Sequence, residues 1–226
     1  MRQLKKQVKR KSARPAAAQR DRDTEARILD AAHTVFVRRG TAGARMQEIA
    51  AEARVNQALL HYYFRSKDRL SKAAFERAAS QLMPVVIQVL ASDADLEQKV
   101  TRIVELELDH LARAPYVPGY IISEITHHPA RARQFVTAVT GLAPEVVGPR
   151  IVAMLQKQID ARVQSGTMRP IAPEQFIVNL MSLCIFPFAA RPMIAAMLGM
   201  DQPGFEQFIA RRRQDLTTFF LGALRR

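Results

Sequence analysis

Apolar residues recur at spacings of three and four along almost the whole chain, and this periodicity constrains the fold more than any other feature. Prolines stand at or near the places where the apolar runs stop, as expected for the first turns of helices and the loops between them. No run alternates strictly between apolar and polar residues over more than a few positions, and Asn-Gly and Asp-Gly turns are absent. The sequence therefore predicts an all-α protein. Helices are expected at about 24–39, 46–53, 56–64, 67–90, 96–113, 120–127, 131–140, 144–165, 173–188 and 205–224.

Positive charge is concentrated in the first third of the chain. The 226 residues carry a net charge of +13, and residues 1–70 hold 17 Lys and Arg against 7 Asp and Glu, a net of +10. Residues 71–226 hold 17 against 14, a net of only +3. A basic segment of this kind is typical of a region that contacts phosphate groups, so nucleic acid is the expected partner of the N-terminal third.

The charge and the helical pattern divide the chain into three parts. We expect a flexible basic arm at 1–22, a small domain at 23–70 and a larger helical domain at 71–226. The first 20 residues carry eight Lys or Arg and no acidic residue, interrupted by the sequence PAAA. Two interpretations of the arm stay open: a solvated tail that aids solubility, and a non-specific contact to a nucleic-acid backbone.

The segment from Met46 to Phe64 has the pattern of two short helices joined by a tight turn. The turn falls at Arg54 and Val55, and Asn56 is placed as the N-cap of the second helix. Tyr63 is expected to be a core aromatic. The other side chains expected in the small core are Phe36, Ile49, Val55, Leu60 and Phe64.

The opposite side of the second helix is expected to face outward. It carries Gln57, Ala58, His61 and Tyr62, with Leu59 at its edge. An amide can pair with adenine, an imidazole with guanine or phosphate, and small or apolar side chains with the thymine methyl group. The phenol of Tyr62, the ammonium of Lys67 and the backbone N–H groups of the following helix are suited to phosphates. The alternative for His61 is an exposed histidine without a partner, and the alternative for Tyr62 is a core aromatic.

Two stretches in this part of the chain, ILDAAHTVFVRRG and MQEIAAEARVNQALLHYYFRSKDRL, resemble the TetR family of bacterial transcription regulators. The motif match covers about residues 24–75, and the remainder matches in architecture only. The resemblance implies a three-helix, helix-turn-helix DNA-binding domain followed by a larger ligand-binding and dimerisation domain. It further implies a homodimer on a near-palindromic double-stranded DNA operator, acting as a repressor that a small-molecule effector releases.

The sequence departs from the family pattern at three places. Where the family commonly has threonines at the start of the second helix, this chain has Ala44 and Arg45, and Arg45 is expected to replace the phosphate contact with a charged one. The turn carries Arg54 where glycine is usual, so either Arg54 adopts the left-handed conformation at a cost of roughly 1 kcal/mol or the turn is shaped differently. His61 stands where a tyrosine is frequent.

In the larger domain, polar and aromatic residues among apolar helices are candidates for an effector pocket. Ordinary core packing is the alternative for each of them. The candidates are Tyr116, Tyr120, Glu124, His127, Asn179 and Phe186. The helix at 173–188 is apolar nearly all round, which indicates that the last two long helices meet a partner subunit.

Other classes of function are disfavoured by what the sequence contains. The histidines lack the spacing that places two metal ligands on one helical face, and no nucleophile elbow or phosphate loop is present, so we expect no metal, no cofactor and no enzyme activity. The single cysteine, Cys184, lies in an apolar stretch typical of a buried thiol and of a cytoplasmic protein. No apolar segment follows the basic N-terminus, so export is not expected. Asn179, Pro187, Arg191 and Pro192 interrupt the most apolar run, at 176–198, so a buried helix is expected there and not a membrane span. An all-helical carrier or enzyme that binds nucleic acid non-specifically remains the alternative.

Overall fold

A computed structural model describes the backbone of residues 2–80 and 83–226, and the side chains from residue 19 onward except at 83, 138 and 139. These residues form twelve α-helices, and their only β pairing is an isolated bridge between Met168 and Arg225. The predicted all-α fold is confirmed. The chain divides into two compact units, Met1–Arg77 (unit 1) and Ala78–Arg226 (unit 2), so the division falls after Arg77 and not after Leu70.

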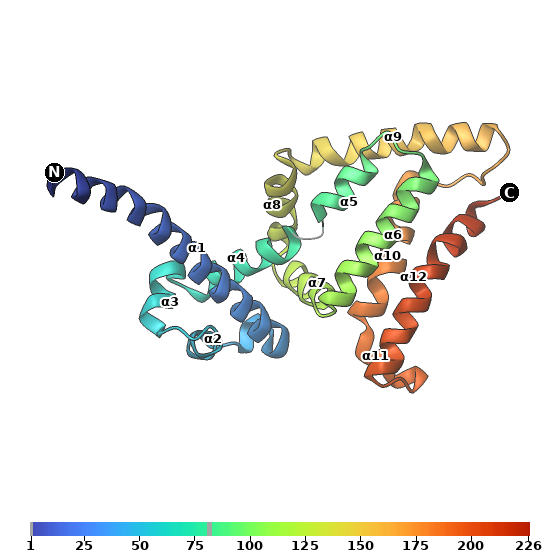
Figure 1. The fold of residues 1–226 in the computed structure, drawn as a ribbon. Helices are drawn as coiled ribbons and strands as arrows, with labels where there is room; N and C mark the ends of the chain where they lie inside the picture. The colour runs from blue at the N-terminus through green and yellow to red at the C-terminus, as the bar shows by residue number, and fades with distance from the viewer. Residues whose placement is uncertain (1, 81–82) are drawn as a thin grey trace. The chain divides into compact units, whose positions relative to one another are not determined.

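Unit 1 contains α1 (Arg2–Gly43), α2 (Met46–Glu52), α3 (Gln57–Phe64) and most of α4 (Lys67–Ser80). The two short helices α2 and α3 lie beside the C-terminal half of α1 (Figure 1). Buried side chains from all four helices form the core of the unit. They include Ile28, Ala32, Val35, Phe36, Ile49, Leu60, Phe64, Leu70 and Phe75. Val55, predicted to belong to this core, is only half-buried because it lies in the turn.

The first helix differs from its prediction at both ends. It begins at Arg2, so the expected arm at 1–22 is not a separate element of the structure. The residues from Ala16 to Arg27 include no glycine or proline and are rich in Ala and Arg, which have high helix propensity. Gly40, the predicted stop, has a non-helical conformation with φ of 67°, and one further turn follows it to Gly43.

Unit 2 consists of eight further helices. Their bounds are α5 (Met83–Leu90), α6 (Leu96–Arg113), α7 (Val117–His127), α8 (Pro129–Thr140), α9 (Pro144–Gln164), α10 (Pro173–Ala189), α11 (Arg191–Leu198) and α12 (Gln202–Leu224). The single helix predicted at 67–90 is two helices, α4 and α5, and residues 81–82 lie outside the described part. The short helix α11 was not predicted. Helices α7 and α8 begin earlier than expected because proline is tolerated in a first turn.

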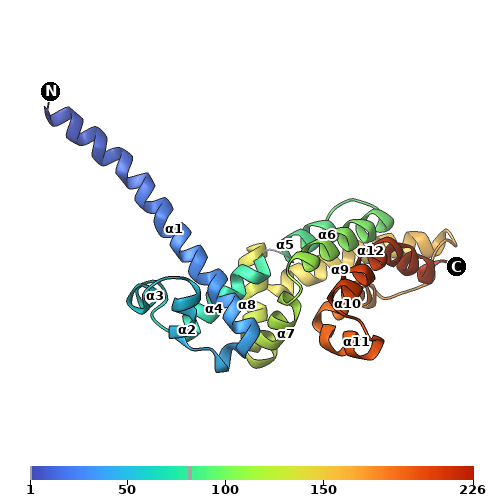
Figure 2. The ribbon, with the colours of Figure 1, turned by 60° about the horizontal axis from the view of Figure 1, so that its bottom comes forward.

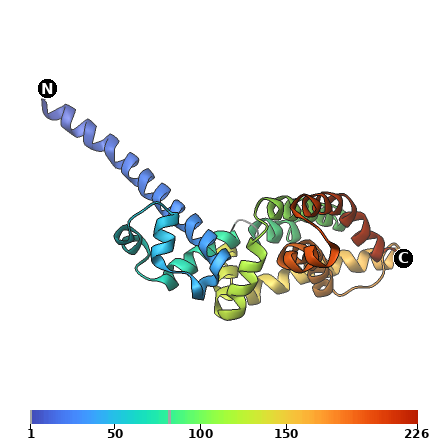
Figure 3. The ribbon, with the colours of Figure 1, turned by 90° about the horizontal axis from the view of Figure 1, so that it is seen from below.

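Helix α6 is central to unit 2. It packs against α12, α10, α5 and α9, and Figure 3 shows it running beside α12. Helix α7 packs against both α8 and α10, and α8 also contacts α9 and α5 (Figure 2). The largest buried cluster of the unit gathers apolar side chains from α6, α9, α10 and α12 around residues such as Val104, Leu155, Phe176 and Phe220. Cys184 is part of this cluster and is a free thiol.

Among the described residues, no single helix is long and apolar enough to cross a membrane. Helices α10 and α11 pass that test of length and composition only when they are taken together, and they are bent by 73° at the break between them.

Candidate nucleic-acid interface

The turn between α2 and α3 closes with two backbone hydrogen bonds. Val55 N donates to Ala50 O at 3.0 Å, and Arg54 N donates to Ala51 O at 3.1 Å. This pair of bonds is a Schellman motif, which requires a left-handed residue just after the helix. Arg54 supplies it with φ of 53°, so the first of the two predicted alternatives for this residue is confirmed. An arginine therefore holds a conformation that favours glycine.

Helix α3 begins with a capped turn. Asn56 is the N-cap, and its side-chain Oδ1 accepts a hydrogen bond from Leu59 N at 2.7 Å. The cap satisfies one of the backbone N–H groups that every helix leaves free at its start. The prediction for Asn56 is confirmed, and the first residues of α3 are fixed by local chemistry.

The two sides of α3 differ in exposure as the sequence predicts. Leu60 is fully buried and Phe64 nearly so. Gln57, Ala58, His61 and Tyr62, which we call the α3 face, are all exposed, and Leu59 is half-buried at the edge. Tyr62 is 74% exposed, although it is a large aromatic residue. An exposed tyrosine beside an amide and an imidazole is an unusual surface for a helix that only packs.

Tyr63 is not the core aromatic that was expected. It is half-buried, and its hydroxyl donates a hydrogen bond to the Asp21 carboxylate on α1 at 3.0 Å. Partial burial and this bond raise the pKa of the phenol. Its ring meets the edge of Tyr62 at a centroid distance of 5.4 Å. Tyr63 thus ties α3 to α1 and supports the neighbouring Tyr62, and the two tyrosines have different roles.

Ion pairs neutralise the acidic residues of α2. Arg38 on α1 pairs with Glu52 at 2.5 Å, and Arg39 pairs with Glu48 at 3.4 Å. Arg45, Arg54 and Arg65 are exposed and form no ion pair with any residue that the structure describes. The surface next to α3 therefore keeps its positive charge, which is the electrostatic condition for binding a phosphate backbone.

Lys67 is engaged within the protein. Its half-buried ammonium donates to Ala42 O at 2.9 Å and Ala44 O at 3.3 Å. These carbonyls lie in the connection between α1 and α2, so Lys67 fixes the entry into α2. A lysine ammonium has three N–H groups, and two of them are used here. Only the third N–H group of Lys67 remains for the predicted contact to phosphate.

The six predicted effector residues differ in their burial. Tyr116, His127, Asn179 and Phe186 are exposed, and His127 Nδ1 lies 2.7 Å from Ser123 O. Tyr120 and Glu124 are buried, and the Glu124 carboxylate forms an ion pair with the buried Arg131 of α8. Packing and pairing therefore account for the buried members of the set.

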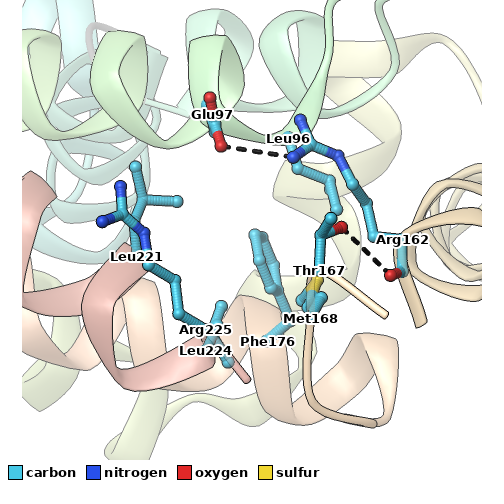
Figure 4. Close-up of a pocket in the computed structure, with 9 residues that line it drawn as sticks. All are labelled: Leu96, Glu97, Arg162, Thr167, Met168, Phe176, Leu221, Leu224 and Arg225. Atoms are coloured by element: carbon cyan, nitrogen blue, oxygen red, sulfur yellow. Dashed lines mark hydrogen bonds and ion pairs between the residues drawn. The ribbon is translucent and has the colours of Figure 1, made fainter. Parts of the chain in front are cut away.

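Three of the cavities and grooves that described residues line in unit 2 contain none of the six predicted residues. The one drawn in Figure 4 lies where α6, α9, α10 and α12 approach one another, and its volume is about 30 Å³. An ion pair between Arg162 and Glu97 at 3.2 Å closes one side of it. This volume suits a water molecule and not an organic ligand. Open grooves of about 710 and 500 Å³ follow α5–α6 and α6–α12.

The described residues contain no cluster of three or more His, Cys, Asp or Glu side chains that could hold a metal ion.

Comparison with known proteins identifies the family to which the helix-turn-helix part of unit 1 is similar. The family model of bacterial regulatory proteins of the tetR family matches residues 28–74, which include α2, the turn and α3. The chain belongs to the TetR family. It is a DNA-binding transcriptional regulator of the helix-turn-helix type, as predicted.

The similarity to TetR-family proteins extends beyond the matched domain. The transcriptional repressor NicS of Pseudomonas putida is 28% identical over 196 residues, covering 86% of this chain and 88% of that protein. The repressor SCO4008 of Streptomyces coelicolor is 32% identical over 130 residues, covering 56% of this chain and 66% of that protein. The solved ketosteroid regulator KstR2 of Mycobacterium tuberculosis has a TM-score of 0.60 at 13% identity, covering 89% and 95% of the two chains, and it supports the fold alone.

Sequence reasoning missed two features of unit 1, which we call the TetR-type head. Arg65 ends α3 with φ of 50° and ψ of −37°, a second arginine with positive φ, and no local pattern marked it. The clamp formed by Lys67 was missed because its acceptors are backbone carbonyls more than 20 residues away, which leave no trace in the spacing of side chains.

Proposed function

We propose that the α3 face enters the major groove of an operator and reads base edges there. The observation that carries the proposal is the sharp division of α3, in which Leu60 and Phe64 are buried while Gln57, Ala58, His61 and Tyr62 are all exposed. Gln57 presents an amide suited to adenine, and Ala58 is small enough to meet a thymine methyl group. Tyr62 stands out far enough to reach the sugar-phosphate backbone.

Cations around the α3 face would hold the phosphates. Arg45 flanks the start of α2, and Arg54 and Arg65 flank the two ends of α3, all three without an ion-pair partner among the described residues. Arginine suits this task because its planar guanidinium can donate two hydrogen bonds to one phosphate. Lys67 would contribute its remaining N–H while it holds the α1–α2 connection. The basic residues at 1–22 add positive charge at the same end of the chain.

A homodimer would place two heads on one operator. Apolar side chains stay exposed on the last helices of unit 2, among them Val178 and Phe186 on α10 and Phe219 on α12. Exposed apolar surface of this kind is typical of a protein interface. We infer that α10 and α12 form the dimer interface. Two heads reading successive major grooves require half-sites centred about 34–36 Å apart.

Two relatives are named repressors, and we propose repression for this chain as well. Release would require a small-molecule effector that binds unit 2 more tightly in the released state than in the DNA-bound state, because equal affinity shifts no equilibrium. Helix α4 runs from the TetR-type head into unit 2 without a break, since the division falls inside it. A displacement of α4 is therefore the simplest way to pass the effector signal. The proposed compartment is the cytoplasm, where the DNA is.

Selection of bound DNA from a random pool tests the proposal. The full chain is expected to enrich a near-palindromic site whose half-sites lie one helical turn apart. A variant with Gln57→Ala and Tyr62→Ala should enrich that site far less, while an exposed change in unit 2, Lys157→Ala, serves as the control. Recovery of no preferred site, with binding that depends only on salt, would instead indicate a helical carrier with a basic surface.

A further inference from the structure

Glu107 is a buried acid without a hydrogen-bond partner. It lies in the middle of α6, its side chain is part of a residue that is only 1% exposed, and its Oε2 has no partner among the described residues. A buried carboxylate without a partner is among the most costly groups that a protein interior can hold. Burial raises the pKa of Glu107 to about 7.

The groups that face Glu107 do not neutralise it. Cys184 on α10 is fully buried and close enough to interact electrostatically, and burial, followed by Glu107, raises the pKa of its thiol to about 12. Arg212 on α12 turns its guanidinium to the Leu183 carbonyl, with Nη2 at 2.8 Å and Nε at 3.1 Å. The thiol is neutral, and no ion pair joins Arg212 to Glu107 in the described structure. The carboxyl therefore lacks a cation.

His110 extends the same row of α6 by one turn. Residues three apart lie on one side of a helix, so His110 neighbours Glu107. Its Nε2 is also buried without a partner, while the residue as a whole is half-buried. Burial, and then Arg113, lowers the pKa of the imidazole, which keeps it neutral. The two unsatisfied groups thus lead from the edge of unit 2 to its interior.

Other buried charges in unit 2 are satisfied, and this sets Glu107 apart. The fully buried Lys99 donates to Leu90 O at 2.9 Å and to Gln158 Oε1 at 3.1 Å. Glu124 pairs with Arg131. Native interiors leave few polar atoms unpaired, and those they leave call for an explanation. A missing ligand explains both Glu107 and His110 with one partner.

We propose that Glu107 and His110 recognise the effector, and that this effector is a small organic amine with an apolar body. The protonated nitrogen would donate to Glu107 Oε2, and the neutral imidazole of His110 would take a second hydrogen bond at its Nε2. The fully buried Ile103 and Leu111, one turn away from Glu107 on either side along α6, would have to move apart to admit the body of the ligand and would then contact it. The inference rests on the proposed effector control, whose ligand class it names.

Three probes that share a ring and differ in charge test the ligand class. Benzylamine, benzyl alcohol and benzoate are titrated by calorimetry into the full chain at about pH 8, where an alkylamine is protonated and Glu107 is ionised. The amine is expected to bind at least about 30-fold more tightly than the alcohol, as expected for a desolvated charge pair, with no measurable binding of benzoate. Equal affinity for amine and alcohol, or no binding of the amine, would overturn the proposal.

Two variants on α6 test whether Glu107 is the residue that binds the amine. Glu107→Gln keeps the shape and should weaken amine binding about 30-fold, to the level of the alcohol. Glu105→Gln is the matched control, because Glu105 is exposed and pairs with Arg102 only at 3.9 Å, and it should bind the amine as the wild type does. An unchanged affinity in Glu107→Gln would remove Glu107 from the site.

Stability without ligand provides a second readout. If Glu107 awaits a ligand, Glu107→Gln raises the melting temperature, because functional sites carry groups that cost stability. A lower melting temperature would assign Glu107 a partner within the fold and contradict the proposal. The two proposals can fail separately. If the chain selects an operator but does not bind the amine, only the amine proposal is contradicted. If it binds the amine but selects no operator, only the DNA-reading proposal is contradicted.

Discussion

Among the described residues, the charged side chains that are buried all lie in unit 2, and the TetR-type head has none. In the head, Arg45, Arg54 and Arg65 are exposed and available to a partner. In unit 2, Lys99, Glu107 and Glu124 are buried. Exposed arginines cost little stability and give affinity for phosphates, whereas each buried charge must find a partner or destabilise the fold. This difference supports the proposals that the head binds DNA at its surface and that unit 2 encloses its ligand.

The largest expected effect on stability concerns Lys99, the buried cation that has hydrogen-bond partners. Lys99→Met keeps the apolar stem but leaves the Leu90 carbonyl and Gln158 Oε1 without their donor. The loss of two charge-assisted hydrogen bonds should lower the free energy of unfolding by about 3 kcal/mol. Urea unfolding measures the change. The exposed Lys157→Met should stay within about 0.5 kcal/mol of the wild type, and equal stability of the two variants would contradict the interior role of Lys99.

Glu107 should make stability depend on pH in the opposite direction to a paired acid. Burial raises its pKa in the folded state to about 7 from an ordinary value of 4.5, so the folded state holds the proton more tightly than the unfolded state. Its contribution is complete below pH 4.5 and is lost as the pH rises through 7. Across this window the wild type should lose about 3 kcal/mol relative to Glu107→Gln. A constant difference between the two at every pH would show that Glu107 does not titrate there.

Lys67 combines the two kinds of charge that are compared here, because its ammonium is bound within the head and also lies close to the head's surface. Lys67→Ala should lower the free energy of unfolding by about 1.5 kcal/mol, since the Ala42 and Ala44 carbonyls lose a charged donor. Its third N–H should also reduce the salt dependence of operator binding by about one unit per head. Lys72→Ala, on the exposed side of α4, is the control for both readouts. A stability loss with an unaltered slope would leave Lys67 a structural role only.

The smallest effect concerns the turn of the head. Arg54→Gly should raise the free energy of unfolding by about 1 kcal/mol, because glycine takes the left-handed conformation without strain. Gly166 closes α9 with the same two hydrogen bonds and φ of 72°, so Gly166→Arg is the reciprocal variant and should lower stability by a similar amount. A loss of stability in Arg54→Gly would mean that the arginine side chain makes a contact that outweighs the strain.

Local patterns made the head predictable from sequence. The cap at Asn56, the break at Gly40 and the two sides of α3 each depend on neighbours within a few residues. Tyr63 was misplaced because its partner, Asp21, lies 42 residues away. The family resemblance rests on the same local segment. It therefore supports the prediction most strongly in the head, where the residue pattern already predicted the structure.

Unit 2 was predictable in its helices and not in its interior. Six helices of unit 2 were anticipated within a few residues of their bounds. Helix α5 was merged with α4, and α11 was not predicted because its apolar run continues that of α10 across Arg191 and Pro192. Lys99 and Glu107 stand on the apolar stripe of α6, between Leu96, Ile103 and Leu111. A charge on such a stripe is a signal of a buried charge. Which of the two would find a partner depended on α9, α10 and α12, which only the fold brings near.

The measurement that tests the central claim most directly is the binding of Gln57→Ala to the selected operator and to all its single-base variants. If the α3 face reads bases, the variant loses about 1–3 kcal/mol of discrimination at one base pair in each half-site and keeps its preference elsewhere. Wild-type discrimination at every position, with affinity lowered uniformly or not at all, would contradict direct reading by this face.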